Sequence, residues 1–451
     1  MESDTIEIIA ETSEDSEMEA RTEREVHRMR KDYTLLIFLC AVTFGLLQII
    51  PVAVSDIAEL AASTTRDVSL GFPIHAVAYC IGALSFSWLM DRIGRPLCLV
   101  AALILSAILT LSIPLFGYIQ WYWLAQAILG IMSPGFELAS NSWIVGMWQE
   151  SADRYKQVLL LGMSIGIASV SAIIKPFLSH TEFHDMGTDG NFTTTTTLYH
   201  GDQIWIPFSL VACSAAAVAV IILIIYRKQP ETALFSDPFP QGHPTTTART
   251  GNERGNSIVD VTLGCLLMGF FAGSEYNTVT LIPTFAVFCP LHLFKSTSAF
   301  MYSAMTAASG VSLLLSMWIA QRVSPRNMLF AAMTIVTAGN VLLWFASQDD
   351  PEVLMWIALC IMGCGNATVI PSIYSYLALE MEMTYTVFVW FAFSKSLFRA
   401  SASFITSVYI VTQPLCLIHV NLVCLVVAIF LLSVIACKNA CMKKPIRSNK
   451  S

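Results

Sequence analysis

Twelve apolar runs constrain the fold of this chain more than any other feature. Each run reaches about 20 residues, the length that an α-helix needs to cross the hydrocarbon core of a bilayer. Only 13% of the 451 residues are charged, whereas soluble globular proteins carry about 25%. Backbone polar groups in lipid must be satisfied internally, so we predict an all-α membrane protein. Its twelve transmembrane helices are predicted at residues 33–54, 71–90, 97–118, 121–148, 158–179, 204–226, 258–288, 297–320, 328–347, 353–379, 385–411 and 416–437.

The distribution of lysine and arginine predicts that both termini are cytoplasmic. With that orientation, cytoplasmic segments hold 20 of the 25 basic residues, and the outer loops hold only Arg66 and Lys295. Such an asymmetry follows the positive-inside rule for multi-pass proteins. The plasma membrane is favoured over an endosomal membrane, for which DTIEII near the N-terminus is a weak sorting candidate.

A long polar loop divides the chain into two sets of six helices, which suggests an internal duplication. The predicted parts are an acidic cytoplasmic tail (1–32), an N-terminal six-helix bundle (33–226), a cytoplasmic linker (227–257), a C-terminal six-helix bundle (258–437) and a basic cytoplasmic tail (438–451). The longest outer loop contains the sequon Asn191-Phe-Thr, so we expect an N-linked glycan at Asn191.

The loop after the second predicted helix carries a motif. It reads SWLMDRIGRP (87–96), and the corresponding loop of the second half reads QRVSPRN (321–327). The first loop resembles the signature Gly-x-x-x-Asp-Arg-x-Gly-Arg of the major facilitator superfamily. Four residues match that signature, with Ser87 in place of its first glycine: Asp91, Arg92, Gly94 and Arg95.

Four other stretches narrow this resemblance: GFELASNSWIVGMW, GMSIGIASVSAIIKPFL, GFFAGSEYNTVT and GCGNATVIPS. They are similar to segments of the sodium-dependent glucose transporter branch of that superfamily, which is related to fucose permease. The resemblance implies two six-helix bundles around a cavity lined by spans one, four, seven and ten. It also implies a hexose-like solute and coupling to protons or sodium. That branch usually has an acidic residue near position 399, where this chain has Lys395 and Arg399, so the coupling ion stays open.

Glu137 lies in the middle of the fourth predicted helix, within the stretch PGFELASNSW. A charged side chain at this depth costs roughly 2.5–3.5 kcal/mol on insertion scales, so it needs a partner, a cavity or a function. Asn141 is four residues further on and shares a helix face with Glu137. One interpretation is a carboxylate that takes a proton or accepts hydrogen bonds from a solute. The alternative is a structural polar link between helices.

Other polar or aromatic side chains at mid-depth are predicted to contact solute or cation. Glu275 follows Gly273 and precedes Pro283, which predicts a break in the seventh helix. An aromatic ring in the fourth helix has two interpretations, stacking on a sugar or packing between helices. The predicted binding set is Gln48, Glu137, Asn141, Trp143, Glu275, Asn277 and Asn366.

Lys395 and Arg399 share one face in the middle of the eleventh predicted helix. Both cations need anionic or carbonyl partners, and we predict a buried ion pair between the two halves that opens and closes. A conformational role is also predicted for the loop residues Asp91, Arg92, Gly94 and Arg95, because a loop charge can pair with neighbouring helices in one state only.

The sequence shows no phosphate-binding glycine loop, metal-ligand cluster or nucleophile with a nearby base, so neither an enzyme, a cofactor nor a metal is expected. The expected partners are a small polar solute, with a sugar favoured, and membrane lipid. No nucleic acid is expected, and the chain should be a monomer. The predicted function is secondary active transport of a hexose-like solute by alternating access. A facilitative uniporter and a non-transporting receptor or scaffold stay open as alternatives.

Overall fold

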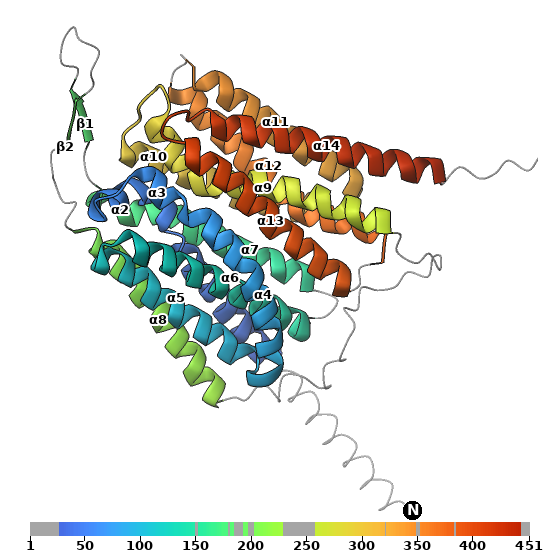
Figure 1. The fold of residues 1–451 in the computed structure, drawn as a ribbon. Coiled ribbons are helices and arrows are strands. Elements are labelled where there is room, and N and C mark those ends of the chain that lie inside the picture. Colours follow the sequence, from blue (N-terminus) through green and yellow to red (C-terminus); the bar gives the residue numbers. More distant parts are fainter. Residues whose placement is uncertain are drawn as a thin grey trace, which may run out of the picture.

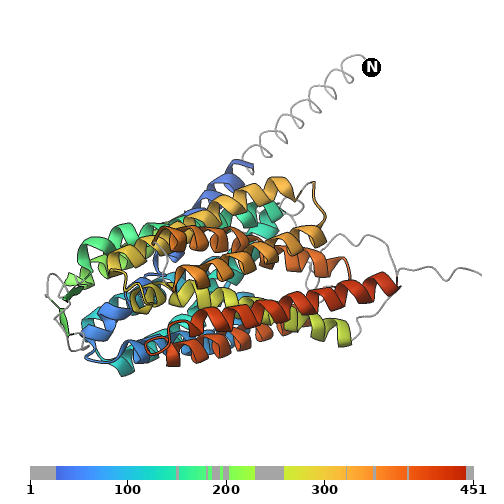
Figure 2. The same ribbon diagram turned by 90° about the horizontal axis from the view of Figure 1, so that it is seen from above.

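The computed structural model describes residues 27–148, 152–178, 181–184, 193–196, 203–228, 258–320, 322–348, 352–382 and 385–442. These residues form twelve long helices that run side by side in one bundle (Figures 1 and 2). The elements are the first helix (27–46), η1 (Ile50–Val52), α2 (Val54–Leu60), α3 (Thr65–Ser69), α4 (Gly71–Ile93), α5 (Arg95–Phe116), α6 (Ile119–Trp148), α7 (Ala152–Ile174), η3 (Lys175–Phe177), β1 (Thr181–His184), β2 (Thr193–Thr196), α8 (Trp205–Lys228), α9 (Ile258–Phe288), α10 (Lys295–Ile319), α11 (Pro325–Ala346), α12 (Glu352–Ala378), α13 (Tyr385–Tyr409) and α14 (Cys416–Met442).

Several predicted boundaries are wrong by a few residues. Residues 27–32 of the predicted tail are already helical, α8 continues into the predicted linker, and α14 continues into the predicted C-terminal tail. The predicted break in the seventh span is also wrong, because α9 is one continuous helix with Pro283 inside it. The remainder of both tails and of the linker lies outside the described residues, as does Asn191.

Ten of the long helices are apolar enough to cross a membrane by length and composition. The other two, α6 and α13, have similar lengths but carry the charged side chains singled out above. Both pack against neighbouring long helices: α6 against α4 and α5, and α13 against α4 and α9. Charged side chains within the spans therefore occur on both of these helices, and Glu275 adds one on α9, which is among the ten.

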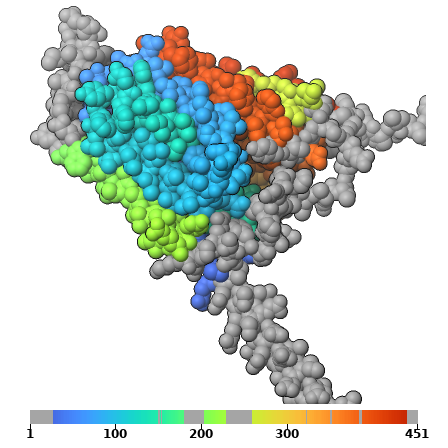
Figure 3. All heavy atoms as spheres, turned by 60° about the horizontal axis from the view of Figure 1, so that its bottom comes forward, coloured from blue at the N-terminus to red at the C-terminus, as the bar shows by residue number. Residues whose placement is uncertain are grey.

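The two halves of the bundle meet along two helix pairs. α7 packs on α10, and α4 packs on α13. Figure 3 shows one such border, where the blue and teal N-terminal half meets the orange and red helices of the C-terminal half. The predicted position of the eleventh span at the border between halves is therefore what the structure shows for α13.

The β1–β2 strand pair lies at one end of the bundle, which we call the hairpin end, and the last residues of α14 lie at the other (Figures 1 and 2). Polar contacts close the two halves on each other toward the hairpin end. Lys295 Nζ at the start of α10 lies 2.6 Å from Glu59 Oε1 and 3.5 Å from Asp56 Oδ1 of α2. The Ser407 hydroxyl of α13 donates to the Ser69 carbonyl of α3 at 2.9 Å.

The loop motif and its counterpart in the second half make the same kind of contact. Arg92 lies over the Trp88 ring at the end of α4, with 4.4 Å from its Cζ to the ring centroid. Arg322 lies over the Trp318 ring at the end of α10, also with 4.4 Å from its Cζ to the ring centroid. In both loops the arginine follows its tryptophan by four residues. Gly94 has φ +83°, a backbone conformation that favours glycine, and it lets α5 begin directly after α4. Asp91 and Arg92 are exposed here.

One close helix crossing predicts a clear effect on stability. A Cβ on Gly166 of α7 would meet the Val42 carbonyl oxygen of the first helix and lie 2.9 Å from the Gly45 Cα. We expect Gly166→Ala to destabilise the protein by about 1–3 kcal/mol, the usual cost of overpacking. Thermal unfolding in detergent measures this. Gly310→Ala is the matched control, since its Cβ would come no closer than 3.3 Å to a neighbouring atom. Equal stability of the two variants would contradict the close approach of α7 to the first helix at Gly166.

Candidate functional site

Glu137 lies at the middle of α6 and is exposed, although α6 runs inside the bundle. α4 approaches this part of α6 closely, because Gly135 leaves room for the Phe86 ring. The Tyr79 hydroxyl of α4 donates a hydrogen bond to Glu137 Oε2. The Asn141 side-chain amide instead donates to the Glu137 backbone carbonyl at 2.7 Å. The carboxylate is thus positioned by α4 and keeps one oxygen, Oε1, without a hydrogen bond among the described residues.

α13 places two cations near the carboxylates. Arg399 Nη2 lies 3.6 Å from Glu275 Oε2 of α9, and its Cζ lies 5.6 Å from the Tyr276 ring centroid. Both α9 and α13 belong to the C-terminal half, so the predicted ion pair between the halves is wrong for Arg399. The pair is also incomplete, because Glu275 Oε2 and Arg399 Nε are buried without a hydrogen-bond partner.

Lys395 lies one helical turn from Arg399 and is 8% exposed. Its charge acts on Glu137 of the N-terminal half and on Glu275 of its own half. Among the described residues it forms an ion pair with neither carboxylate. Lys395 is therefore a buried cation that is near two anions and held by no ion pair with them.

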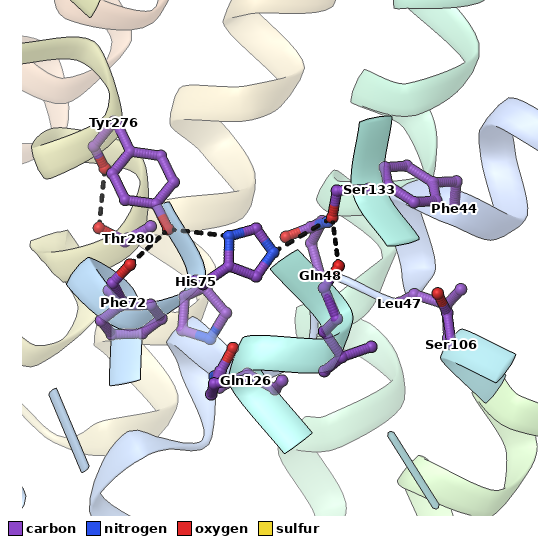
Figure 4. A pocket seen from close by; sticks show the side chains of 13 residues that line it. Phe44, Leu47, Gln48, Phe72, His75, Ser106, Gln126, Ser133, Tyr276 and Thr280 are labelled. Atoms are coloured by element: carbon purple, nitrogen blue, oxygen red, sulfur yellow. Dashed lines mark hydrogen bonds between the residues drawn. The ribbon is translucent and has the colours of Figure 1, made fainter. Parts of the chain in front are cut away.

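His75 of α4 and Tyr276 of α9 connect the two halves directly (Figure 4). The Tyr276 hydroxyl lies 3.2 Å from the Phe72 carbonyl oxygen and 3.3 Å from His75 Nδ1. His75 Nε2 lies 3.1 Å from the Ser133 hydroxyl, which itself donates to the Leu129 carbonyl. Because the Ser133 proton is already used, His75 must donate from Nε2, and Nδ1 of a neutral ring is left as an acceptor.

A cavity of about 40 Å³ adjoins this connection. It is lined by the first helix, η1, α4, α5, α6 and α9, and its polar lining includes Gln48, Gln126, Ser133 and Thr280 (Figure 4). A cavity of this size and polarity has room for a few ordered water molecules. Three of the four spans implied by the resemblance, one, four and seven, contribute to it, whereas α12 does not.

The other predicted binding residues lie in helix packing in this conformation. Asn277 is fully buried and its amide donates to Asn421 Oδ1 of α14 at 2.9 Å, which links α9 to α14. Trp143 is 1% exposed and packs on Tyr33 with 5.3 Å between ring centroids. Asn366 of α12 is buried as well. Packing, rather than stacking on a sugar, is thus the interpretation of Trp143 that fits this conformation.

Three residues of the site were not singled out from the sequence: His75, Tyr79 and Tyr276. His75 could have been singled out from the sequence, because histidine within a membrane span is an ionisable group that needs a polar partner. His75 and Tyr79 are also four residues apart, which places them on one helix face. Tyrosines are too common in spans for Tyr276 to stand out.

The geometry brings a carboxylate from each half and two cations of α13 to the middle of the bundle. Such a set can bind a proton at a carboxylate, accept hydrogen bonds from hydroxyl groups and attract an anion at the cations. Groups of three or more His, Cys, Asp or Glu side chains that could hold a metal ion are absent from the described part of the chain.

Comparisons with known proteins agree with this architecture. The family model of the Major Facilitator Superfamily matches residues 34–403. Comparison with curated protein sequences gives no significant match. Among solved structures, the chain is similar to the inward open conformation of the xylose transporter XylE from E. coli, with a TM-score of 0.62 and 12% sequence identity. That alignment covers 89% of this chain and 95% of XylE, and at this identity it shows a shared fold.

Proposed function

The chain belongs to the major facilitator superfamily, and from that membership we propose that this membrane transporter moves a hexose-like polar solute by proton-coupled alternating access. The observation that carries the proposal is the charged cluster of Glu137, Glu275, Lys395 and Arg399 at mid-depth. Ionisable groups are expensive inside a membrane, and they mark solute or proton paths. A cluster assembled from both halves can respond to the relative movement of those halves.

The state of the two ends supports alternating access. At the hairpin end the halves are joined by the Lys295 ion pairs and by the bond between Ser407 and Ser69. At the opposite end Trp88, Asp91 and Arg92 of the loop motif are exposed. The conformation is thus closed toward the hairpin end, which we propose is the outer side. Opening it requires the loss of the Lys295 contacts.

A proton is the coupling ion that we propose. Both carboxylates feel the positive charges of Lys395 and Arg399, which oppose the binding of any added cation, sodium or proton. A proton, unlike sodium, binds covalently to a carboxylate oxygen, and Glu137 is exposed enough to receive one. The unpaired Arg399 Nε and the Glu137 oxygens would serve as donor and acceptors for solute hydroxyls.

Uptake into vesicles that contain the purified full-length protein tests this function. Labelled D-glucose should accumulate when the exterior is acid and should not respond to a sodium gradient of the same size. Uptake without accumulation under either gradient would identify a uniporter, for which Glu137 held by Tyr79 is only a hydroxyl acceptor. Empty vesicles serve as the control. A non-transporting receptor would give no uptake of any solute tried.

The proposed orientation has a separate test. With both termini in the cytoplasm, the segment between η3 and α8 faces outward at the plasma membrane, and Asn191 carries an N-linked glycan. Enzymatic removal of N-glycans from the protein in cells should increase its gel mobility. Asn191→Gln should abolish that change, whereas Asn449→Gln in the predicted cytoplasmic tail should leave it intact. A mobility change that survives Asn191→Gln would contradict the orientation.

A further inference from the structure

Lys395 lacks a role in the transport of a neutral hexose. It is 8% exposed, lies at mid-depth on α13 and forms no ion pair with Glu137 or Glu275 among the described residues. Arg399, one turn away, is only partly neutralised by Glu275, since their nearest atoms are 3.6 Å apart and the buried Arg399 Nε has no hydrogen-bond partner. A buried cation is strongly unfavourable unless nearby anions balance it, so the charge states of Glu137 and Glu275 decide whether the cluster needs a further anion.

The charge balance of the cluster depends on Glu137. The Tyr79 hydroxyl of α4 donates a hydrogen bond to Glu137, and the charges of Glu275 of α9 and of Lys395 and Arg399 of α13 act on it. With both carboxylates ionised, two negative charges balance two positive charges. A proton on Glu137 removes one negative charge and leaves the cluster with a net charge of plus one. Lys395 of the C-terminal half is then no longer balanced by the negative charge of Glu137 in the N-terminal half.

We propose that the transported solute is a small hydroxylated carboxylate, of the sugar-acid class, that binds through its carboxylate to Lys395 and Arg399 when Glu137 is protonated. This inference rests on the proposed transport function and replaces its neutral hexose by the corresponding acid. The anion restores the balance that the proton removed, so proton and solute are loaded together. Either charge alone would leave the cluster unbalanced, and this couples the transport of proton and solute.

The cluster offers matching contacts for the remainder of such a solute. Arg399 Nε is a buried donor without a partner, and a guanidinium suits a carboxylate in a planar, two-bond geometry. Glu137 and Tyr79 lie on the opposite half and can bond solute hydroxyls. The solute would thus bridge α13 of one half and α6 and α4 of the other, as alternating access requires.

The test compares a hexose with its own acid in vesicles that contain the full-length protein. Labelled D-glucuronate should be taken up faster than labelled D-glucose when the exterior is acid. Its uptake should be insensitive to an inside-negative potassium diffusion potential, because one proton and one anion carry no net charge. Proton-coupled uptake of a neutral hexose would instead be accelerated by that potential.

Variants of Lys395 sharpen the test. Lys395→Met should raise the apparent KM for glucuronate by about 10- to 100-fold, the usual effect of losing a hydrogen bond to a charged group. Lys395→Arg should restore most of the affinity. Lys438→Met, which removes a lysine paired with Asp260 at the end of the bundle, is the matched control. Stabilisation of each detergent-solubilised variant against heat by glucuronate gives a second readout that does not need transport.

Each outcome separates the inference from the function on which it rests. Uptake of glucose but not of glucuronate, with Lys395→Met unaffected, would overturn the inference and leave the proposed transport function intact. Glucuronate uptake that is accelerated by the inside-negative potential would also overturn the balanced coupling. Uptake of neither solute, with no thermal stabilisation by either, would overturn both the inference and the proposed function.

Discussion

Glu137→Gln is expected to abolish accumulation of solute against its gradient while preserving exchange of solute at equal concentrations. Glutamine keeps the size of the side chain and a carbonyl that can accept the Tyr79 hydrogen bond, but it cannot gain or lose a proton. The variant therefore resembles the protonated state permanently. With an acid exterior of one pH unit, one-to-one coupling supports up to about tenfold accumulation, because one unit corresponds to about 1.36 kcal/mol. The variant should show none of it.

The assay is uptake and counterflow exchange in vesicles across external pH. Glu352→Gln is the matched control, since this exposed carboxylate at the start of α12 accepts a hydrogen bond from Trp356 and lies far along the chain from the cluster. It should accumulate solute like the unaltered protein. Full accumulation by Glu137→Gln would show that the proton binds elsewhere. Loss of exchange as well would make Glu137 a solute acceptor, as a uniporter requires.

The number and type of the helices could be predicted because hydropathy reports directly on the solvent around each segment. Ten helices carry that signal plainly, and the stretches around Glu137, Lys395 and Arg399 were singled out because charge inside an apolar run is costly. The residues of the charged cluster could thus be identified from the sequence, although their interaction partners could not. That Arg399 pairs with α9 of its own half depends on helix rotation, which a charge pattern does not encode.

Other features were beyond sequence reasoning for a physical reason. Trp143 and Glu137 lie six residues apart on α6. Helical periodicity alone could not show that Trp143 packs on Tyr33 of the first helix whereas Glu137 stays exposed. α9 carries polar residues on several sides, so the sequence placed Asn277 in the predicted binding set together with Glu275. The structure instead shows Asn277 bonded to Asn421 of α14. Lys295 counted only as a basic residue of an outer loop, because its contact with Asp56 joins positions 239 residues apart.

That contact gives the second large expected effect. Lys295→Glu would place a third carboxylate beside Asp56 and Glu59, and repulsion would open the halves at the hairpin end. Lys295 and Asp56 are both largely buried, and removing one partner of a buried pair typically costs about 3–5 kcal/mol. A shift of this size moves a two-state equilibrium by more than about a hundredfold. The transporter should therefore stay open at that end and its maximal transport rate should fall by at least about tenfold.

Cys289 reports on the opening directly. It lies just beyond α9 and is fully buried in the closed state. In a chain that retains only this cysteine, Lys295→Glu should make it react with a membrane-impermeant maleimide added outside, whereas Arg66→Glu, a charge reversal at an exposed site of α3, should not. Combining Asp56→Lys with Lys295→Glu restores opposite charges, so both the protection of Cys289 and the transport rate should return in part. Unchanged labelling and transport in Lys295→Glu would mean that these ion pairs do not hold the hairpin end closed.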